Sequence, residues 1–248
     1  MFLTTKGLVL REAKYKEADK ILTVLTESEG KLTVSARGVM RKGSRLSAAS
    51  QHLTYSEMTL FGNKGRWSLN EAETLEQFIG LRQDIGILAL GDYFAELLEA
   101  LSDEDSPNPQ MLRLGLNALY ALSRGKYPPE HIKAVFEMRL MCLAGYEPFL
   151  DGCGVCGAGA AEDMLFSLGG GMLHCRTCRD GHTGASLPLC PDSVSALRYI
   201  AWSDPKKIFA FSLSGDAAKR LYDVCEGYVS AQLERGFSAL EYWKTVKG

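Results

Sequence analysis

The sequence predicts an α+β protein with more than one domain: a small five-stranded barrel followed by an all-α domain that carries a four-cysteine module. Three observations predict this class. Short β-type runs separated by turns fill residues 1–75, helical periodicity begins near Gln77, and two Cys-x-x-Cys pairs interrupt the helices. We place the domains at 1–78 and 79–248, with the cysteine module inserted at about 150–190.

Composition indicates a soluble globular protein. The chain has 248 residues, of which 46% are hydrophobic and 23% charged, and a formal net charge of -2. These values exclude a disordered chain, and no apolar run is long enough for a membrane span or a secretion signal. An odd total of seven cysteines fits a reducing cytoplasm better than a disulfide framework.

Five short strands are expected in the amino-terminal part. Residues 32–36 alternate apolar and polar side chains as a half-buried strand does, and glycine-containing turns separate the runs. The expected strands are 8–10, 21–26, 31–36, about 53–61, and one that begins at residue 66. Five such strands are typical of the oligonucleotide-binding (OB) fold, with a generic five-stranded barrel as the alternative.

Positive charge is concentrated in this barrel. Residues 31–66 contain seven basic residues and one acid, Glu57, and part of the run forms a glycine-punctuated loop after the third strand. A charge run is often only a solvated face, but the rim of an OB barrel favours a nucleic-acid surface. The candidate DNA-binding residues are Lys31, Arg37, Arg41, Lys42, Arg45, Lys64 and Arg66. Either base stacking or core packing would suit the nearby aromatic residues Tyr15, Tyr55, Phe61 and Trp67.

From Gln77 onward the apolar residues recur at helical spacing. Stripes of this kind are most simply the core of a helical bundle. Prolines, glycines and acidic residues mark their ends. The expected helices include 93–101, 110–123, 132–143, 192–202 and 216–234.

The two Cys-x-x-Cys pairs predict one structural zinc ion, bound by Cys153, Cys156, Cys175 and Cys178. Two residues between cysteines let both sulfurs face one ion, and four thiolates leave no open position for catalysis. Two disulfides or four unrelated core thiols are the alternatives. We expect the neighbouring His174 and His182 to be surface residues.

Common catalytic motifs are absent from the sequence. It has no Walker loop, Rossmann fingerprint, His-Glu-x-x-His pair or Gly-x-Ser-x-Gly elbow. The zinc deaminase signature also fails, because no His-x-Glu precedes the cysteine pairs. We therefore expect no catalytic residues, and an enzyme is the weaker hypothesis.

Several segments together resemble the bacterial RecO family. They occur in the family's order and cover roughly residues 6–180, including the first cysteine pair. The segments are KGLVL from Lys6, ILTVLTE from Ile21, Gly30-Lys31, ARG from Ala36, SRL from Ser44, FEMRL from Phe136 and GYEP from Gly145.

The resemblance implies an OB barrel, a helical domain and, as in many members, a zinc module. It also implies a recombinational DNA repair mediator that binds single- and double-stranded DNA and anneals complementary strands. Such a protein helps load RecA onto DNA coated by single-strand binding protein, with RecR and possibly RecF as partners. Its expected location is the cytoplasm, in association with the nucleoid.

Two other functions and one partner site complete the expectations. A zinc-containing protein-protein adaptor, or an RNA-binding factor without annealing activity, would also suit a basic barrel with a zinc module. The tail of a single-strand binding protein is acidic with an apolar end, so its receptor needs a hydrophobic groove with a basic rim. We place a candidate groove at Lys133, Val135 and Arg139 in the helical domain, where Phe136 more simply packs in the core.

Overall fold

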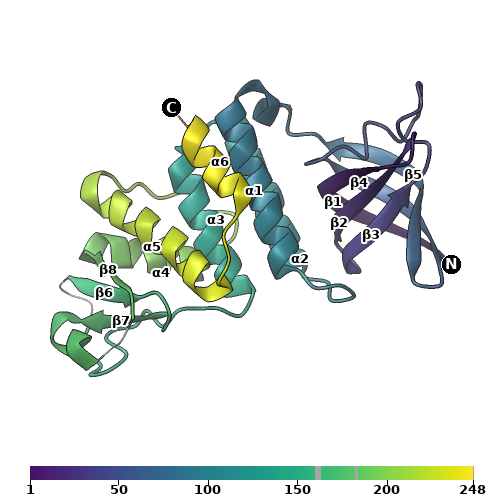
Figure 1. The fold of residues 1–248 in the computed structure, drawn as a ribbon. Coiled ribbons are helices and arrows are strands. Elements are labelled where there is room, and N and C mark those ends of the chain that lie inside the picture. Colours follow the sequence, from purple (N-terminus) through teal and green to yellow (C-terminus); the bar gives the residue numbers. More distant parts are fainter. Residues whose placement is uncertain (160–162, 182–183, 248) are drawn as a thin grey trace. The chain divides into compact units, whose positions relative to one another are not determined.

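The computed structural model describes residues 1–159, 163–181 and 184–247. The chain divides into two compact units, Met1–Lys126 with Phe237–Gly248, and Tyr127–Gly236. The elements of both units are labelled in Figure 1. The domain boundary that the sequence predicts between residues 78 and 79 stays a prediction.

A closed five-stranded barrel forms the amino-terminal part of the first unit (Figure 1), which confirms the predicted fold class. The strand order around the barrel is β1-β2-β3-β5-β4. Neighbouring strands are antiparallel except β3 and β5, which run parallel. The strands are β1 (Phe2–Tyr15), β2 (Asp19–Thr26), β3 (Gly30–Ala36), β4 (Tyr55–Asn63) and β5 (Arg66–Glu76).

Alternate residues of each strand fill the barrel. Since side chains of a strand point to opposite faces in turn, the inward set is apolar, and the outward set is mostly polar except for the buried Leu8, Leu10 and Leu25. The core comprises Val9, Leu22, Val24, Leu32, Val34, Ala36, Val39, Met58, Leu60 and Leu69. Each large aliphatic side chain buried here contributes about 1.5–3 kcal/mol to folding. The same alternation turns Thr33 and Ser35 of β3 to the outside.

Strand β1 is much longer than the three residues that the sequence predicts. Its first half pairs with β4, from Phe2 opposite Phe61 to Leu8 opposite Tyr55. Its second half pairs with β2, and the register shifts between Val9 and Arg11. A shift of this kind is a bulge, which bends the strand so that it can close the barrel. Polar residues in both halves conceal this length from a search for apolar runs.

Helices α1 (Ile85–Leu101) and α2 (Pro109–Arg124) follow the barrel in the same unit, after the short 3-10 helix η1 (Ile79–Gln83). Asp84 caps α1 by accepting a hydrogen bond from the backbone N–H of Ile87 (2.8 Å). The α2 helix ends at Gly125, whose φ of +61° suits glycine. The end of α2 agrees with the predicted stop at Gly125, whereas α1 begins at Ile85, before the predicted range 93–101.

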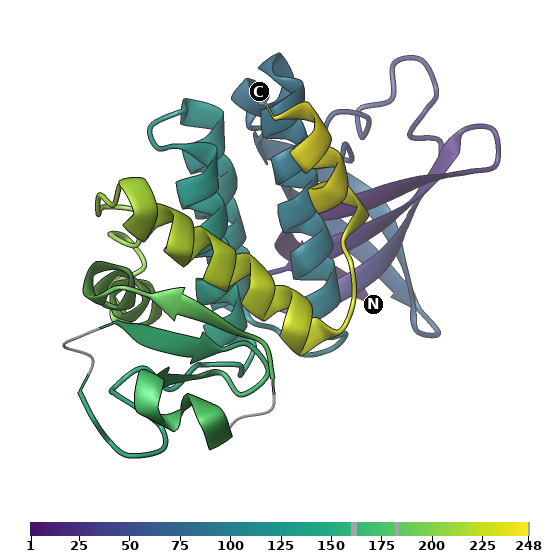
Figure 2. The ribbon, with the colours of Figure 1, turned by 60° about the vertical axis from the view of Figure 1, so that its left-hand side comes forward.

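The last helix, α6 (Ser238–Val246), belongs to the first unit and packs against α1. The two helices lie side by side in Figure 2. Phe237 meets Tyr93 edge to face at 5.7 Å, and Trp243 is buried. The sequence pattern does not predict this helix, because its nine residues are too few for a clear period.

The second unit combines helices with a small sheet. The helices α3, α4 and α5 agree with the predicted ones to within a few residues. A three-stranded sheet with the order β7-β6-β8 is an addition to the all-α expectation. The elements are α3 (Pro129–Leu143), β6 (Met164–Ser167), β7 (Met172–Cys175), η2 (Arg176–Gly181), β8 (Ser186–Leu189), α4 (Pro191–Trp202) and α5 (Gly215–Leu233).

The sheet packs against helix α5 (Figure 2). Phe166 of β6 meets Tyr228 of α5 edge to face at 5.3 Å. Gly227 lies against Leu168 and Leu187, where a side chain would crowd both leucines. The sheet thus anchors the cysteine module to the helices of its unit. In the described part of the chain, no helix is long and apolar enough to cross a membrane.

Candidate metal centre and nucleic-acid interface

The first cysteine pair lies on a tight turn before β6. The backbone N–H of Gly157 donates to the carbonyl of Cys153 (2.9 Å), and the N–H of Cys153 donates to Ala158 (2.8 Å). Gly157 has a φ of +73°, a conformation that glycine adopts at little cost. This turn brings Cys153 and Cys156 to the same side of the chain.

The second pair comes from the end of the small sheet. Cys175 is the last residue of β7, and Cys178 lies in η2 directly after it. The N–H of Gly154 donates to the carbonyl of Leu173 on β7 (2.8 Å), which ties the first turn to this strand. Two local turns and one hydrogen-bonded contact therefore bring the four thiols together.

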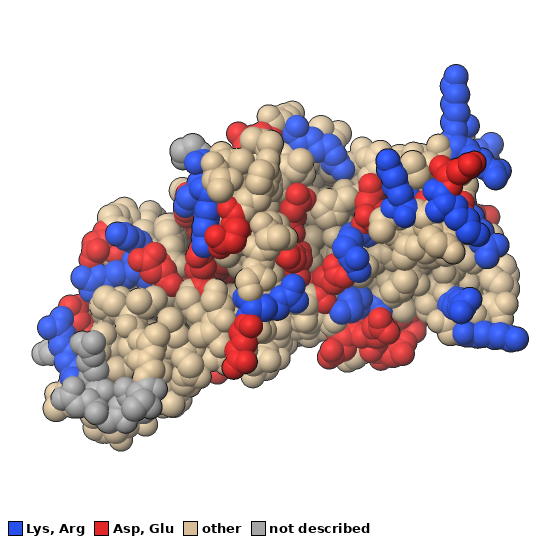
Figure 3. Space-filling model, in the orientation of Figure 1, with Lys and Arg blue, Asp and Glu red and all other residues tan. Residues whose placement is uncertain are grey.

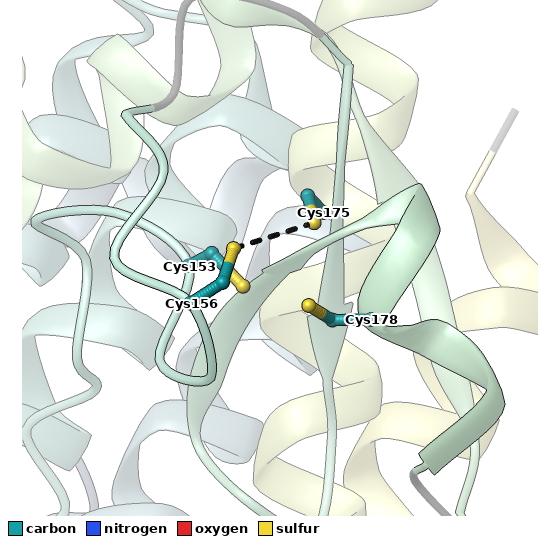
Figure 4. A group of neighbouring side chains, drawn as sticks. All are labelled: Cys153, Cys156, Cys175 and Cys178. Atoms are coloured by element: carbon teal, nitrogen blue, oxygen red, sulfur yellow. Dashed lines mark hydrogen bonds between the residues drawn. The ribbon is translucent and has the colours of Figure 1, made fainter.

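The four sulfurs form a compact cluster, as Figure 4 shows. All four lie within 4.8 Å of one another, and the Sγ atoms of Cys156 and Cys175 are 3.8 Å apart. Ligands about 2.3 Å from a tetrahedral ion lie about 3.8 Å apart, whereas a disulfide holds its sulfurs at about 2.05 Å. All seven cysteines of the chain are free thiols. The cluster can therefore bind one metal ion, and the disulfide alternative does not fit.

Thiol acidity in the cluster is uneven. Burial raises the pKa of Cys153, but hydrogen bonds from backbone N–H groups of the loop outweigh this and lower it to about 6. Hydrogen bonds with the neighbouring cysteines instead raise the pKa of Cys178 to about 12. Several thiolates at such short distances repel one another unless a cation lies between them. The donor set thus suits a soft divalent ion such as zinc.

The two histidines near the cluster differ from the expectation. His174 is fully buried, and its Nε2 lies 3.1 Å from the hydroxyl of Ser186 on β8. The prediction of a surface residue is therefore wrong, because alternation along β7 turns His174 to the face opposite Cys175. His182 lies outside the described residues.

The seven predicted DNA-binding residues lie at three places on the barrel. Blue side chains project from it in Figure 3. Arg37, Arg41, Lys42 and Arg45 are exposed on and beside the loop after β3. Lys64 and Arg66 are exposed at the β4–β5 turn, and Lys31 is the second residue of β3. The structure therefore divides one run of charge in the sequence into separate groups.

An uncharged strip connects these groups across β3 and β5. The parallel pairing sets Ser35 beside Ser68 and Val34 beside Trp67, and Thr33 and Arg66 are the residues that directly precede the latter pair. Thr33 and Arg66 are exposed, and both serines are partly exposed. Short hydroxyl side chains leave the backbone accessible and carry no negative charge. A phosphate chain can cross this strip from Arg37 to Arg66 without meeting an acidic side chain of these two strands.

The basic tip of the β1–β2 hairpin was not predicted from the sequence. Gly38 N donates to the carboxylate of Asp19 (2.7 Å), and Met40 N donates to Ala18 O (2.9 Å). These bonds hold the basic loop against the hairpin tip, where Lys14 and Lys16 are exposed.

Nearby acids conceal this tip in a count of charge. Glu12 is held by an ion pair with Lys20 (2.8 Å) and Asp19 is held by the loop, while Glu17 is exposed beside Lys16. Tyr15, with Lys16 Nζ 5.3 Å from its ring centroid, is 48% exposed. The Lys-Tyr-Lys sequence of residues 14–16, at a turn between two strands, could have indicated this basic tip.

Lys31 differs from the other six residues. Its Nζ donates to the backbone carbonyl of Glu99 near the end of α1 (2.7 Å), and its N–H donates to Asp103 O (3.0 Å). A cation is favourable at the carbonyl end of a helix. Lys31 therefore has a structural role in joining the barrel to α1, and its predicted contact with DNA stays a prediction.

The predicted partner groove is closed in this structure. Val135 is fully buried, and Lys133 is 3% exposed in ion pairs with Glu137 (2.9 Å) and Glu226 (2.8 Å). Arg139 donates to the carbonyls of Ile200 and Ala201. These side chains hold helices of the second unit together. The predicted groove therefore does not fit this conformation.

The fold and these two candidate sites define a class of protein: a five-stranded OB-type barrel with exposed basic residues, followed by helices and a four-cysteine cluster that can bind a metal ion. Comparison with known families agrees over nearly the whole chain. The model described as "Recombination protein O N terminal" matches residues 1–78, and "Recombination protein O C terminal" matches residues 82–241. The chain belongs to the RecO family.

Individual relatives carry the same name. The chain is 33% identical to the "DNA repair protein RecO" of Acetivibrio thermocellus, across 99% of this chain and 97% of that protein. It is 30% identical to that of Alkaliphilus metalliredigens, across 99% and 100%. It is 34% identical to that of Listeria monocytogenes, across 70% and 67%.

Proposed function

We propose that this protein is a recombinational DNA repair mediator. It binds single- and double-stranded DNA through its barrel, anneals complementary strands, and helps load RecA onto DNA coated by single-strand binding protein. The observation that carries this proposal is the exposed basic face of a barrel that belongs to the RecO family. Annealing needs a surface that lowers the repulsion between two phosphate chains, which this face can supply.

The DNA-binding role rests on six exposed residues. Lys31 is included as a seventh, although its ammonium group also bonds to the carbonyl of Glu99. The loop residues Arg41, Lys42 and Arg45 follow the phosphates of a flexible strand, while Arg37, Lys64 and Arg66 extend the contact along the barrel. Binding of this kind depends on charge and has no sequence preference.

The cysteine cluster holds one Zn²⁺ that serves folding. Its four ligands leave no position for water or substrate, and the strands next to it have only four residues each. In such modules metal binding supplies much of the folding free energy. The protein acts without catalysis of its own, and the barrel (1–78) and the helical part (79–248) are its functional domains.

The remaining partners are RecR, with RecF in addition where the pathway requires it, and single-strand binding protein. RecA is an indirect partner, because it binds the DNA from which single-strand binding protein has been displaced. The protein works in the cytoplasm, in association with the nucleoid.

Annealing of complementary strands already covered by single-strand binding protein is the decisive test. We expect the protein to accelerate annealing of the covered strands in a manner that moderate salt weakens. Competition between DNA and RNA strands of equal length separates this function from that of an RNA-binding factor. Failure to anneal covered or bare strands would contradict the proposal.

A further inference from the structure

Two phenylalanines form an exposed aromatic pair at the rim of the barrel. Phe2 of β1 and Phe61 of β4 are register partners, and their ring centroids lie 5.2 Å apart with a tilt of 54°. Phe2 is 65% exposed and Phe61 is 38% exposed. Exposing two neighbouring aromatic rings to water is unfavourable, and such a patch commonly marks a binding site.

Positive charge borders this pair. Lys64 and Arg66 are exposed on the turn that follows Phe61. The amino group of Met1 lies 3.3 Å from the carbonyl of Gly62, directly after Phe61. The nearest acid in the strand register is Glu71, opposite Thr59, and it bounds the patch on one side. Aromatic faces next to cations suit a ligand with flat rings and negative charge.

The pair also continues the strip of the proposed DNA surface. Phe61 is opposite Ser68 on β5, and Ser68 is beside Ser35 on β3. Phe2, Phe61, Ser68 and Ser35 therefore lie on one rung around the outside of the barrel. Adjacent strands are about 4.8 Å apart, so the aromatic pair begins within roughly two strand spacings of Ser35. A strand on the β3–β5 strip can thus reach the pair.

Trp67 cannot take this role as readily. Its ring covers Gly62, where an added Cβ would lie 2.7 Å from the ring. The side chain is partly buried and packs against the barrel core. The tryptophan therefore closes the barrel, and the phenylalanine pair remains as the aromatic surface on this rung.

We propose that Phe2 and Phe61 are a base-stacking subsite for single-stranded nucleic acid. The inference rests on the proposed DNA-binding function and adds the part of the surface that distinguishes unpaired from paired bases. An unpaired base offers a free ring face to a phenylalanine, whereas a base inside a duplex is already stacked on its neighbours. Lys64 and Arg66 hold the adjoining phosphates.

The test compares three probes of equal length: an oligo-dT strand, an abasic strand and a duplex. We expect the wild type to bind oligo-dT more tightly than the abasic strand. Replacing both residues (Phe2→Ala with Phe61→Ala) should weaken oligo-dT binding at least about fivefold, since stacking contributes that much or more per base. Affinity for the abasic strand and the duplex should stay within about twofold, and the salt slope should not change, because no phosphate contact is removed.

Two variants guard against a folding artefact. Phe2→Leu with Phe61→Leu keeps the apolar surface but removes the rings, and should show the same selective loss. Tyr242→Ala removes a 49% exposed aromatic residue on α6 and should bind every probe as the wild type does. Thermal unfolding of each variant checks the fold.

Three outcomes would contradict the stacking subsite or the proposed DNA-binding function, and they distinguish between the two. If the wild type binds oligo-dT and the abasic strand equally, the charged surface stands and the stacking subsite does not exist. If the phenylalanine variants bind oligo-dT like the wild type, the pair is not a base-stacking subsite. If the wild type binds none of the probes, the proposed function itself fails.

Discussion

The Sγ atoms of Cys156 and Cys175 lie 3.8 Å apart, although eighteen residues separate them in the sequence. This distance equals the edge of a tetrahedron of thiolates around zinc, about 3.8 Å for bonds of about 2.3 Å. Each cysteine pair is positioned by its own local turn. The distance between the two pairs depends instead on the fold of the whole module.

We therefore expect one zinc ion per chain, lost in Cys175→Ser. Loss of one thiolate weakens the site and with it the folding of the module, so solubility should fall more than intrinsic DNA affinity. Elemental analysis of protein purified without chelator measures the metal. Cys190→Ser is the matched control, since Cys190 lies outside the cluster, next to the Ser193 hydroxyl (3.2 Å). Zinc-free wild-type protein would contradict the assignment.

A second prediction concerns the buried ion pairs of Lys133. Lys133→Met should destabilise the protein by about 3 kcal/mol, because the fully buried Glu137 loses a cation 2.9 Å away. Adding Glu137→Leu should restore much of this, since an apolar pair needs no counter-charge. Equilibrium urea unfolding measures both. An unchanged stability in Lys133→Met would show that the ion pair contributes nothing.

The pH dependence of this effect follows from the pKa of Lys133. Burial lowers this pKa, but attraction from Glu137 and Glu226 outweighs burial and raises it above 10.5. A raised folded-state pKa means that the contribution is present below the unfolded value and is lost as the pH rises through the folded value. The stability difference between wild type and the double variant with Lys133→Met and Glu137→Leu, which leaves no unpaired buried carboxylate, should therefore be constant near neutral pH and change only above about pH 10.5.

Much of the barrel was predictable from the sequence because its strands are apolar runs between glycine turns. The parallel pairing of β3 with β5 was not, since residues 37–65 separate the two strands and no local pattern encodes their register. The uncharged strip of Thr33, Ser35 and Ser68 depends on that pairing. The sequence therefore located the candidate DNA surface on the barrel, but it could not show that an uncharged strip connects its basic groups.

The helical part shows a similar division. Stripes at helical spacing predicted α3 and α5, but the same stripe suggested a groove at Lys133 and Val135 that the structure fills with other helices. A one-dimensional pattern shows which face is apolar and cannot show what covers it. The strands β6, β7 and β8 have four residues each, too few to produce a period.

A third prediction concerns the return of α6 to the first unit. The carboxylate of Glu96 on α1 accepts hydrogen bonds from the backbone N–H groups of Ser238 (3.3 Å) and Ala239 (3.1 Å). It caps the first turn of α6 from another helix. Glu96→Ala should destabilise the protein by about 1 kcal/mol and speed amide exchange in α6. Glu241→Ala is the control, because Glu241 is exposed on α6 and pairs with Lys244 of the same helix.

A fourth prediction separates Lys31 from the other basic residues. Lys31→Gln should lower stability by about 1 kcal/mol, because its ammonium bonds to Glu99 O, and leave the salt dependence of DNA binding unchanged. Arg66→Gln should leave stability unchanged and reduce the salt slope by about 0.7. Unfolding curves and salt titrations of both variants decide the matter. A reduced slope in Lys31→Gln would return Lys31 to the DNA surface.

The last prediction tests the loop directly. With four to six phosphates contacted, single-strand affinity of the wild type should fall with salt at a log-log slope of roughly -3 to -4. Charge reversal of Arg41, Lys42 and Arg45 to Glu should reduce this slope by about 2, weaken binding to all sequences and slow annealing. Zinc content should not change, because the loop lies in the other unit.

The matched control reverses three exposed lysines of the second unit, Lys206, Lys207 and Lys219. It changes the net charge of the protein by the same amount, so it separates a local phosphate contact from a general electrostatic effect, which would weaken both variants alike. Only the loop variant should lose affinity and annealing at moderate salt. If both variants bind and anneal like the wild type, the loop is a solvated face and the DNA surface lies elsewhere on the protein.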